Sequence, residues 1–122
     1  MALRIALLGA ANSIHLRRWA LALVERGHTA CVLTQHCMVD CEQLPSSVET
    51  VVLPYRGQAG YFMNARFVRD VLARWRPDVL NAHYASGYGT TARLVGFRPW
   101  LLSVWGSDVY DFPYKSPLHR WV

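Results

Sequence analysis

Residues that could bind an anion or transfer a proton follow three short apolar segments of the chain. They are the turn Gly9–Ser13 and the side chains of His83 and Asp108. A glycine lets a ligand approach the backbone, and a helix that begins after the turn would offer free N–H groups to an anion. A glycine chosen only for a tight turn would explain Gly9 equally well. The turn therefore favours an anion site without establishing one.

Two histidines adjoin these segments. His15 stands in the first turn of the expected helix, where the positive helix end disfavours a charged imidazole. A neutral His15 could hydrogen-bond a sugar hydroxyl, and the alternative is a surface or interface histidine. His83 ends an apolar segment that reads as a buried strand, and its alternative role is a hydrogen-bonded core histidine.

Asp108 is the carboxylate best placed for acid–base chemistry. It follows the apolar segment Trp100–Val104 after a short turn that contains Ser107. A carboxylate at the mouth of a crevice could accept a proton from an acceptor hydroxyl. It could equally cap the next turn or pair with an arginine, and position alone leaves both roles open.

Further polar residues lie after the third apolar segment. Tyr61 and Asn64 could contact a ligand that carries several hydroxyl groups. Four arginines could form a basic helix face, namely Arg66, Arg69, Arg74 and Arg76. A solvated face explains most of them, whereas a genuine patch would favour an anionic membrane surface or a phosphate-bearing acceptor. Nucleic acid is not an expected partner, because no recognised binding motif accompanies the charge.

The elements that must position these residues alternate between strands and helices. Strands are expected at Leu3–Leu8, Thr29–Gln35, Val48–Leu53, Asp78–Ala82 and Trp100–Val104. The first helix is expected between Ser13, which would cap its start, and Gly27, which would end it. Two more helices are expected over Tyr61–Trp75 and over Thr90–Val95, the latter ended by Gly96, and a fourth is expected to begin at Pro117. The segment Gly57–Gly60 is expected to be a loop.

This alternation predicts an α/β fold. We expect a doubly wound, Rossmann-like parallel sheet of about five strands flanked by helices, in a single domain that spans residues 1–122. Right-handed crossovers favour the strand order 3-2-1-4-5. Ligands of such sheets bind beyond the carboxyl ends of the strands, where the winding reverses. The loops Gly9–His15, His83–Gly89 and Trp105–Asp108 should face that crevice. Cys31, Trp19 and Trp75 are expected in the core.

Composition narrows the class of protein. Hydrophobic residues make up 52% of the chain, which excludes a disordered protein. A length of 122 residues is too short for two ordinary domains. The net charge of +5, with twelve arginines among thirteen basic residues, favours anionic partners. The three cysteines, Cys31, Cys37 and Cys41, show no C-x-x-C spacing, so zinc and redox sites are not expected. We expect a reduced, cytoplasmic setting instead. No secretory signal or apolar stretch of about 20 residues is present.

Three common nucleotide-binding or signalling classes lack their motifs. The first turn has no G-x-G-x-x-G, and no acidic residue ends the second strand, which argues against a dinucleotide dehydrogenase. The G-x-x-x-x-G-K-[ST] loop is also missing. No acidic pair follows the first strand, as a phospho-receiver domain would need.

Four segments, in their order and spacing, resemble the N-terminal domain of a GT-B fold glycosyltransferase of family 4 type. They are RIALLGAANSIHLRRWALALVERGHTACVLT, RWRPDVLNAHYAS, GYGTTARLVG and PWLLSVWGSDVY. The resemblance implies a two-domain enzyme whose N-terminal half binds the acceptor and whose C-terminal half, absent here, binds most of a nucleotide-sugar donor. It further implies retaining transfer without a metal or other cofactor, in polysaccharide, lipopolysaccharide or other glycolipid biosynthesis of a bacterium.

The resemblance also assigns roles to residues. The turn from Gly9 through Asn12 to Ser13 would approach the donor diphosphate. His83, Tyr84 and Ser86 would line the acceptor side, and Asp108 would act as base or orienting group beside Ser107. Two departures stand out: Ala10, Ala11 and Asn12 replace a second glycine and an acidic residue, and Trp105 stands where many relatives have histidine. Trp105 could instead stack on a sugar.

The implied partners are a nucleotide sugar, a sugar or lipid-linked acceptor, the missing C-terminal domain and, peripherally, the cytoplasmic face of the inner membrane. The abrupt end after Val122 suggests a truncated enzyme, and the fragment alone is expected to be inactive. Two alternatives stay open. One is a stand-alone flavodoxin-like module that binds a nucleotide or a partner, and the other is an adaptor that binds a membrane surface through its arginines.

Overall fold

Five parallel strands form one sheet in the order β3-β2-β1-β4-β5, which confirms the predicted topology. The computed structural model describes residues 2–36, 44–84 and 86–104. Its elements are β1 (Arg4–Leu8), α1 (Ile14–Glu25), β2 (Thr29–Thr34), β3 (Glu49–Val52), α2 (Gly57–Met63), α3 (Ala65–Trp75), β4 (Val79–His83), α4 (Tyr88–Val95) and β5 (Trp100–Ser103). The expected helix from Pro117 lies outside the described residues.

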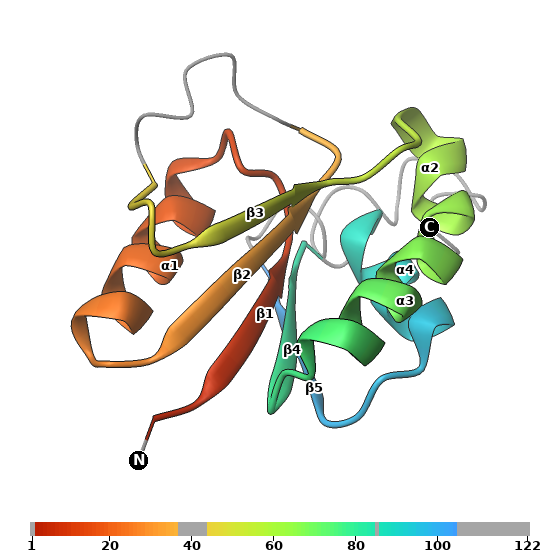
Figure 1. Cartoon of the computed structure of the whole chain (residues 1–122). Helices are drawn as coiled ribbons and strands as arrows, with labels where there is room; N and C mark the ends of the chain where they lie inside the picture. The colour runs from red at the N-terminus through yellow and green to blue at the C-terminus, as the bar shows by residue number, and fades with distance from the viewer. Residues whose placement is uncertain (1, 37–43, 85, 105–122) are drawn as a thin grey trace.

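Helices cover the two faces of the sheet unequally. Figure 1 shows α1 on one face and α2, α3 and α4 on the other. The core is accordingly divided in two, one half under Leu16 and Ala20 of α1 and the other under Val68 and Leu72 of α3. Because α1 packs over β1 and β2, the same face of β4 and β5 lacks a covering helix among the described residues. Leu101 of β5, on that face, is 60% exposed.

The ends of α1 and α4 follow the chemistry expected of them. The Ser13 hydroxyl accepts a hydrogen bond from the backbone N–H of His15 at 3.2 Å, which caps the first turn of α1. Gly27, just after α1, has a φ of 86°, and Gly96, at the end of α4, has a φ of 74°. Left-handed backbone of this kind favours glycine, and it stops each helix where the sequence predicts.

The expected single helix over Tyr61–Trp75 is in fact two helices, and the expected loop Gly57–Gly60 belongs to the first of them. Asn64, at the junction, is fully buried. Its Oδ1 accepts from the Tyr55 backbone N–H at 3.1 Å, and its Nδ2 donates to the Tyr55 carbonyl at 2.8 Å. This pairing ties the junction to the segment before α2, so the chain turns at Asn64.

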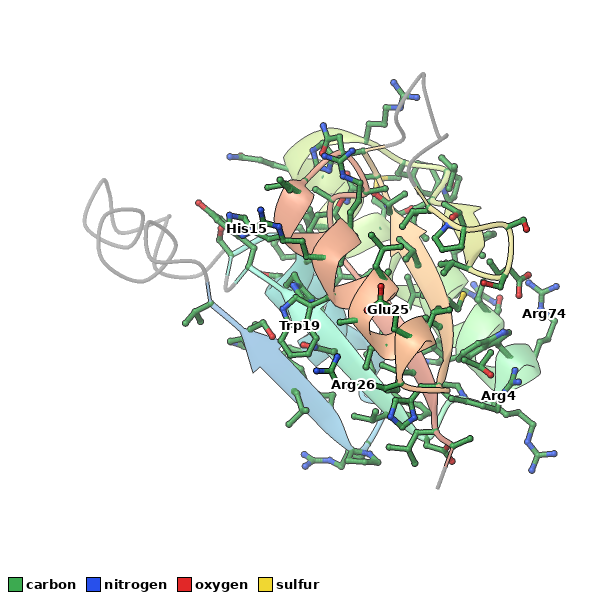
Figure 2. The ribbon with its side chains drawn as sticks, turned by 90° about the vertical axis from the view of Figure 1, so that its left-hand side faces the viewer. Arg4, His15, Trp19, Glu25, Arg26 and Arg74 are labelled. Atoms are coloured by element: carbon green, nitrogen blue, oxygen red, sulfur yellow. The ribbon has the colours of Figure 1, made fainter. Side chains whose placement is uncertain are left out.

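Predictions for the core are confirmed for Cys31 and wrong for Trp19. The Cys31 side chain is 1% exposed, and burial raises the pKa of its thiol to about 12. Trp19 is 46% exposed, because it stands on the flank of α1 beside the uncovered part of the sheet (Figure 2). Trp75 is only partly buried, and the Arg4 guanidinium lies 4.1 Å from the centroid of its ring. None of the helices in the described ranges is long and apolar enough to cross a bilayer.

Candidate functional site

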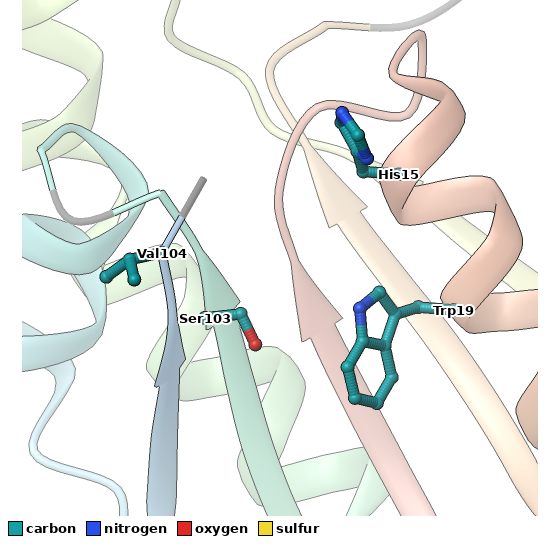
Figure 3. A pocket seen from close by; sticks show the side chains of 4 residues that line it. All are labelled: His15, Trp19, Ser103 and Val104. Atoms are coloured by element: carbon teal, nitrogen blue, oxygen red, sulfur yellow. The ribbon is translucent and has the colours of Figure 1, made fainter. Parts of the chain in front are cut away.

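A cavity of about 450 Å³ lies between the start of α1 and the end of β5. His15, Trp19, Ser103 and Val104 line it (Figure 3). This is the carboxyl edge of the sheet near the reversal of winding between β1 and β4, where the sequence places the crevice. Its volume falls in the range of small-molecule sites.

Each wall of the cavity comes from one element. His15 and Trp19 are four residues apart on α1, so both project from the same flank of the helix. Figure 2 shows them on the side of α1 that faces β4 and β5. Ser103 stands opposite at the end of β5, and its Oγ donates a hydrogen bond to Asn81 Oδ1 of β4 at 3.0 Å. The cavity thus joins one half-exposed aromatic ring to the polar side chains of His15 and Ser103.

His83 lies beneath Trp19 at the end of β4. The two rings meet edge to face, with centroids 5.6 Å apart and planes at 80°. His83 is fully buried, and this burial, with a smaller contribution from His15, lowers its pKa to about 4. Its imidazole is therefore neutral at pH 7, and it supports the wall of the cavity as an uncharged group.

Gly9 supports the same region by packing. A Cβ at this position would lie 3.1 Å from the Cβ of His83 and 3.2 Å from a methyl carbon of Leu16. The Gly9 N–H also donates to the Leu33 carbonyl at 3.1 Å. Close packing of β1, β4 and α1 thus accounts for a glycine here, and contact with a donor diphosphate stays a prediction.

The other predicted site residues are distributed over both faces of the sheet. Tyr84 adjoins β5 through its N–H, which donates to the Ser103 carbonyl at 2.8 Å, and Ser86 is buried. Tyr61 packs against Tyr88 on the opposite face from α1, with ring centroids 5.3 Å apart. The amide of Asn64 is engaged by the Tyr55 backbone, so we do not include Asn64 in the candidate site.

Three predicted residues, Trp105, Ser107 and Asp108, lie outside the described residues. The proposed proton transfer by Asp108 therefore stays a prediction. Within the described ranges, no group of three or more His, Cys, Asp and Glu residues is placed to hold a metal ion.

Sequence reasoning missed Trp19, Ser103 and Val104 as cavity residues. A usable signal lay in the alternation along β4. Val79, Asn81 and His83 point to the face of α1, whereas Leu80 and Ala82 join the apolar core on the other face. Polar residues at alternate positions of a central parallel strand indicate a face that no apolar helix covers.

Comparison with known proteins decides the family. The sequence model described as glycosyl transferase 4-like matches residues 4–122. The chain belongs to the glycosyl transferase 4-like family. The glycosyl transferase 4-like chain has the α/β architecture that its sequence resemblance implied, with the sheet order of a doubly wound half. No curated protein matches the sequence.

Solved structures share the fold of this glycosyl transferase 4-like chain at low identity. A glycinamide-RNase-transformylase T from Mycobacterium tuberculosis is 20% identical, with a TM-score of 0.56 over 81% of this chain and 28% of its own. The C-terminal domain of the PF1911 hydrogenase from Pyrococcus furiosus is 17% identical, with a TM-score of 0.63 over 84% of this chain and 90% of its own. A candidate UDP-N-acetylglucosamine 2-epimerase from Listeria monocytogenes is 13% identical, with a TM-score of 0.59 over 84% and 30%.

The glycosyl transferase 4-like chain thus spans less than a third of two of these three proteins. Their different activities show that the fold alone does not specify the chemistry. Function has to be argued from the family and from the cavity.

Proposed function

We propose that this chain is the acceptor-side half of a retaining, nucleotide-sugar-dependent glycosyltransferase of polysaccharide or glycolipid biosynthesis. Membership of the glycosyl transferase 4-like family supports transfer of a sugar. The single observation that supports a sugar site in this chain is the cavity between His15, Trp19, Ser103 and Val104. It lies at the edge of the sheet where ligands of doubly wound folds bind.

The chemistry of the cavity suits a sugar ring. The half-exposed face of the Trp19 indole can pack against the C–H face of a pyranose, and large rings of this kind contribute much of the energy at binding sites. The His15 imidazole and the Ser103 hydroxyl can exchange hydrogen bonds with sugar hydroxyls. An apolar wall with a few placed polar groups is the common composition of small-molecule sites.

The remaining parts of the reaction belong to the same proposal. The donor is a nucleotide sugar whose diphosphate reaches the turn from Gly9 to Ser13 and whose nucleotide binds a second domain. The acceptor is a sugar or a lipid-linked sugar, Asp108 accepts its hydroxyl proton, and no metal is required. The protein works in a bacterial cytoplasm, at or near the inner face of the membrane.

A stand-alone binding module is the second candidate function. The C-terminal domain of the Pyrococcus furiosus hydrogenase, of which the chain covers 90%, supports it in one respect, because that domain has this fold as a separate structural unit of its protein. In that case the same cavity would bind a nucleotide or a partner and transfer nothing.

Sugar binding can be tested on the chain itself by NMR. We expect monosaccharides and nucleotide sugars to shift the indole N–H resonance of Trp19 in a saturable way. The indole of Trp75 serves as an internal control, since it lies near Arg4 at the opposite edge of the sheet. Equal shifts of both indoles, or none at saturating sugar, would contradict the assignment of this cavity.

A further inference from the structure

A second cavity, of about 230 Å³, lies at the carboxyl edge of the sheet on the far side of β1. It is lined by Asn12, Gln35, His36, Arg56 and Gly57. Among the described residues, none lines both this cavity and the cavity at Trp19. Its residues come from the turn after β1, the end of β2 and the start of α2, which are far apart in the sequence.

Gln35 is the most unusual of these residues. Its side chain is 4% exposed, and neither Oε1 nor Nε2 has a hydrogen-bond partner in the part of the chain that the structure describes. A buried amide whose polar atoms have no partner destabilises the folded chain, because it has lost its hydrogen bonds to water without replacement. This loss is more easily understood if the amide binds a ligand, to which it offers an acceptor oxygen and an NH2 group with two N–H donors.

The surroundings hold Gln35 in this position. Its backbone N–H donates to Tyr88 Oη at 2.9 Å. On the other side α2 passes so close that a Cβ at Gly60 would lie 2.8 Å from Gln35 Oε1. The glycine therefore permits the approach of α2, and the Gln35 amide is fixed beside the cavity.

Hydrogen bonding also fixes which ring nitrogen of His36 carries the proton. Thr34 Oγ1 accepts from the N–H of Ala11 at 3.0 Å and from the N–H of His36 at 2.9 Å, which leaves its own proton available to the neighbouring Tyr88 Oη. Tyr88 Oη, which also accepts from Gln35, must then donate to His36 Nδ1. The proton of a neutral His36 consequently resides on Nε2.

His36 is neutral near pH 7. The residue is exposed overall, but partial desolvation of its imidazole and the nearby Arg56 guanidinium both lower its pKa below the ordinary value. It therefore presents an uncharged N–H donor, while Arg56 is exposed and supplies the positive charge at the cavity. No carboxylate is among the described lining residues. Donors and one guanidinium in this arrangement select an oxyanion, which arginine can bind through two parallel hydrogen bonds.

We propose that this cavity is a subsite for a small hydroxylated anion, a sugar phosphate or a sugar acid, which places its anionic group on Arg56 and a hydroxyl on the Gln35 amide. His36 Nε2 and the Asn12 amide complete the set of polar contacts. The volume is below the usual range for drug-sized ligands and suits one monosaccharide unit. The proposal does not require sugar transfer, because binding is measured directly on the chain.

Calorimetric titrations of the chain with four probes test this subsite. The probes are glucose 1-phosphate, glucuronate, glucose and inorganic phosphate. We expect at least one of the two hydroxylated anions to bind at least tenfold more tightly than glucose or phosphate alone, and the stronger one identifies the anionic group. Equal affinity for glucose, or no binding of either anion by natively folded chain, would overturn the proposal.

Two variants locate the binding. Arg56→Gln should weaken it at least tenfold, whereas Arg74→Gln, the same loss of charge at the exposed end of α3, should leave it unchanged. Gln35→Leu should abolish the preference for hydroxylated anions without lowering the melting temperature, because it removes both unsatisfied atoms and keeps a similar volume. Equal effects of the two arginine variants, or unaltered binding by Gln35→Leu, would contradict the subsite. If Gln35→Leu does not fold, the pair of arginine variants decides.

Discussion

The indole of Trp19 meets the imidazole of His83 edge to face, with ring centroids 5.6 Å apart. One ring is half exposed in the cavity, and the other is fully buried at the end of β4. The contact therefore links a surface that can touch a ligand to a histidine whose protonation is suppressed. It also joins α1 to the central strand at the reversal of winding.

Removal of Trp19 should change the titration of His83. In Trp19→Ala, water reaches the imidazole, so the pKa should rise from about 4 toward its ordinary value near 6.5. NMR titration of the His83 ring protons measures this shift, and Trp75→Ala at the other edge of the sheet is the control. An unchanged His83 titration in Trp19→Ala would show that Trp19 does not shield it.

Stability should fall on mild acidification because of His83. Its folded pKa, about 4, lies below the unfolded value of about 6.5, so between these values the unfolded chain binds more protons. Stability is fully present above pH 6.5 and decreases as the pH falls toward 4, by up to about 3 kcal/mol. Urea unfolding between pH 7 and pH 4.5 measures the loss, to which the lowered pKa of His36 adds in the same direction. His83→Gln should flatten the dependence, and an equally steep curve would refute this origin.

Gly87 should tolerate alanine less well than Gly96 does. Both have positive φ, 59° and 74°, but a Cβ at Gly87 would lie 2.6 Å from Cζ of Tyr61, whereas a Cβ at Gly96 meets nothing within 4 Å. Gly96→Ala should cost about 1 kcal/mol for the left-handed backbone. Gly87→Ala should cost about 1–3 kcal/mol more, because Tyr61 is held by Tyr88. Denaturant unfolding of both variants gives the comparison, and equal losses would mean that Tyr61 moves aside freely.

Asn64 should act on stability rather than on ligand binding. Asn64→Ala removes both hydrogen bonds to the Tyr55 backbone in a buried site, and we expect a loss of about 2–4 kcal/mol. The exposed Asn12→Ala is the matched control and should change the free energy of unfolding by less than about 0.5 kcal/mol. Thermal unfolding of both variants tests this, and similar melting temperatures would argue against the junction described for α2 and α3.

Sequence patterns predicted the sheet well because each strand is a short apolar run bounded by a turn. The run that ends at Gly9 became β1 at the centre, and the caps at Ser13 and Gly96 lie where their chemistry requires. Local patterns could not reveal Asn64 as a helix junction, because its partner Tyr55 lies in a preceding loop. Trp19 looked like core, since helical spacing cannot show which part of a sheet the helix leaves uncovered.

The residues that line the two cavities were harder to predict for the same reason. Gln35 reads as the last residue of a buried strand, and only the approach of Gly60 and Tyr88 shows that its amide is buried without a partner. His15 was singled out by its place at the start of a helix, and the structure brings it to the cavity. Ser103 reaches that cavity through the register of β4 with β5, which no single segment encodes.

Sugar transfer by the natural protein that contains this sequence is the most direct test of the central claim. The measurement is incorporation of labelled sugar from a panel of nucleotide sugars into a polysaccharide or lipid fraction. We predict incorporation from at least one donor, a loss of at least tenfold in Trp19→Ala and in Asp108→Asn, and full activity in the surface control Arg74→Gln. No transfer from any donor by folded protein, or full activity in Trp19→Ala, would contradict the account.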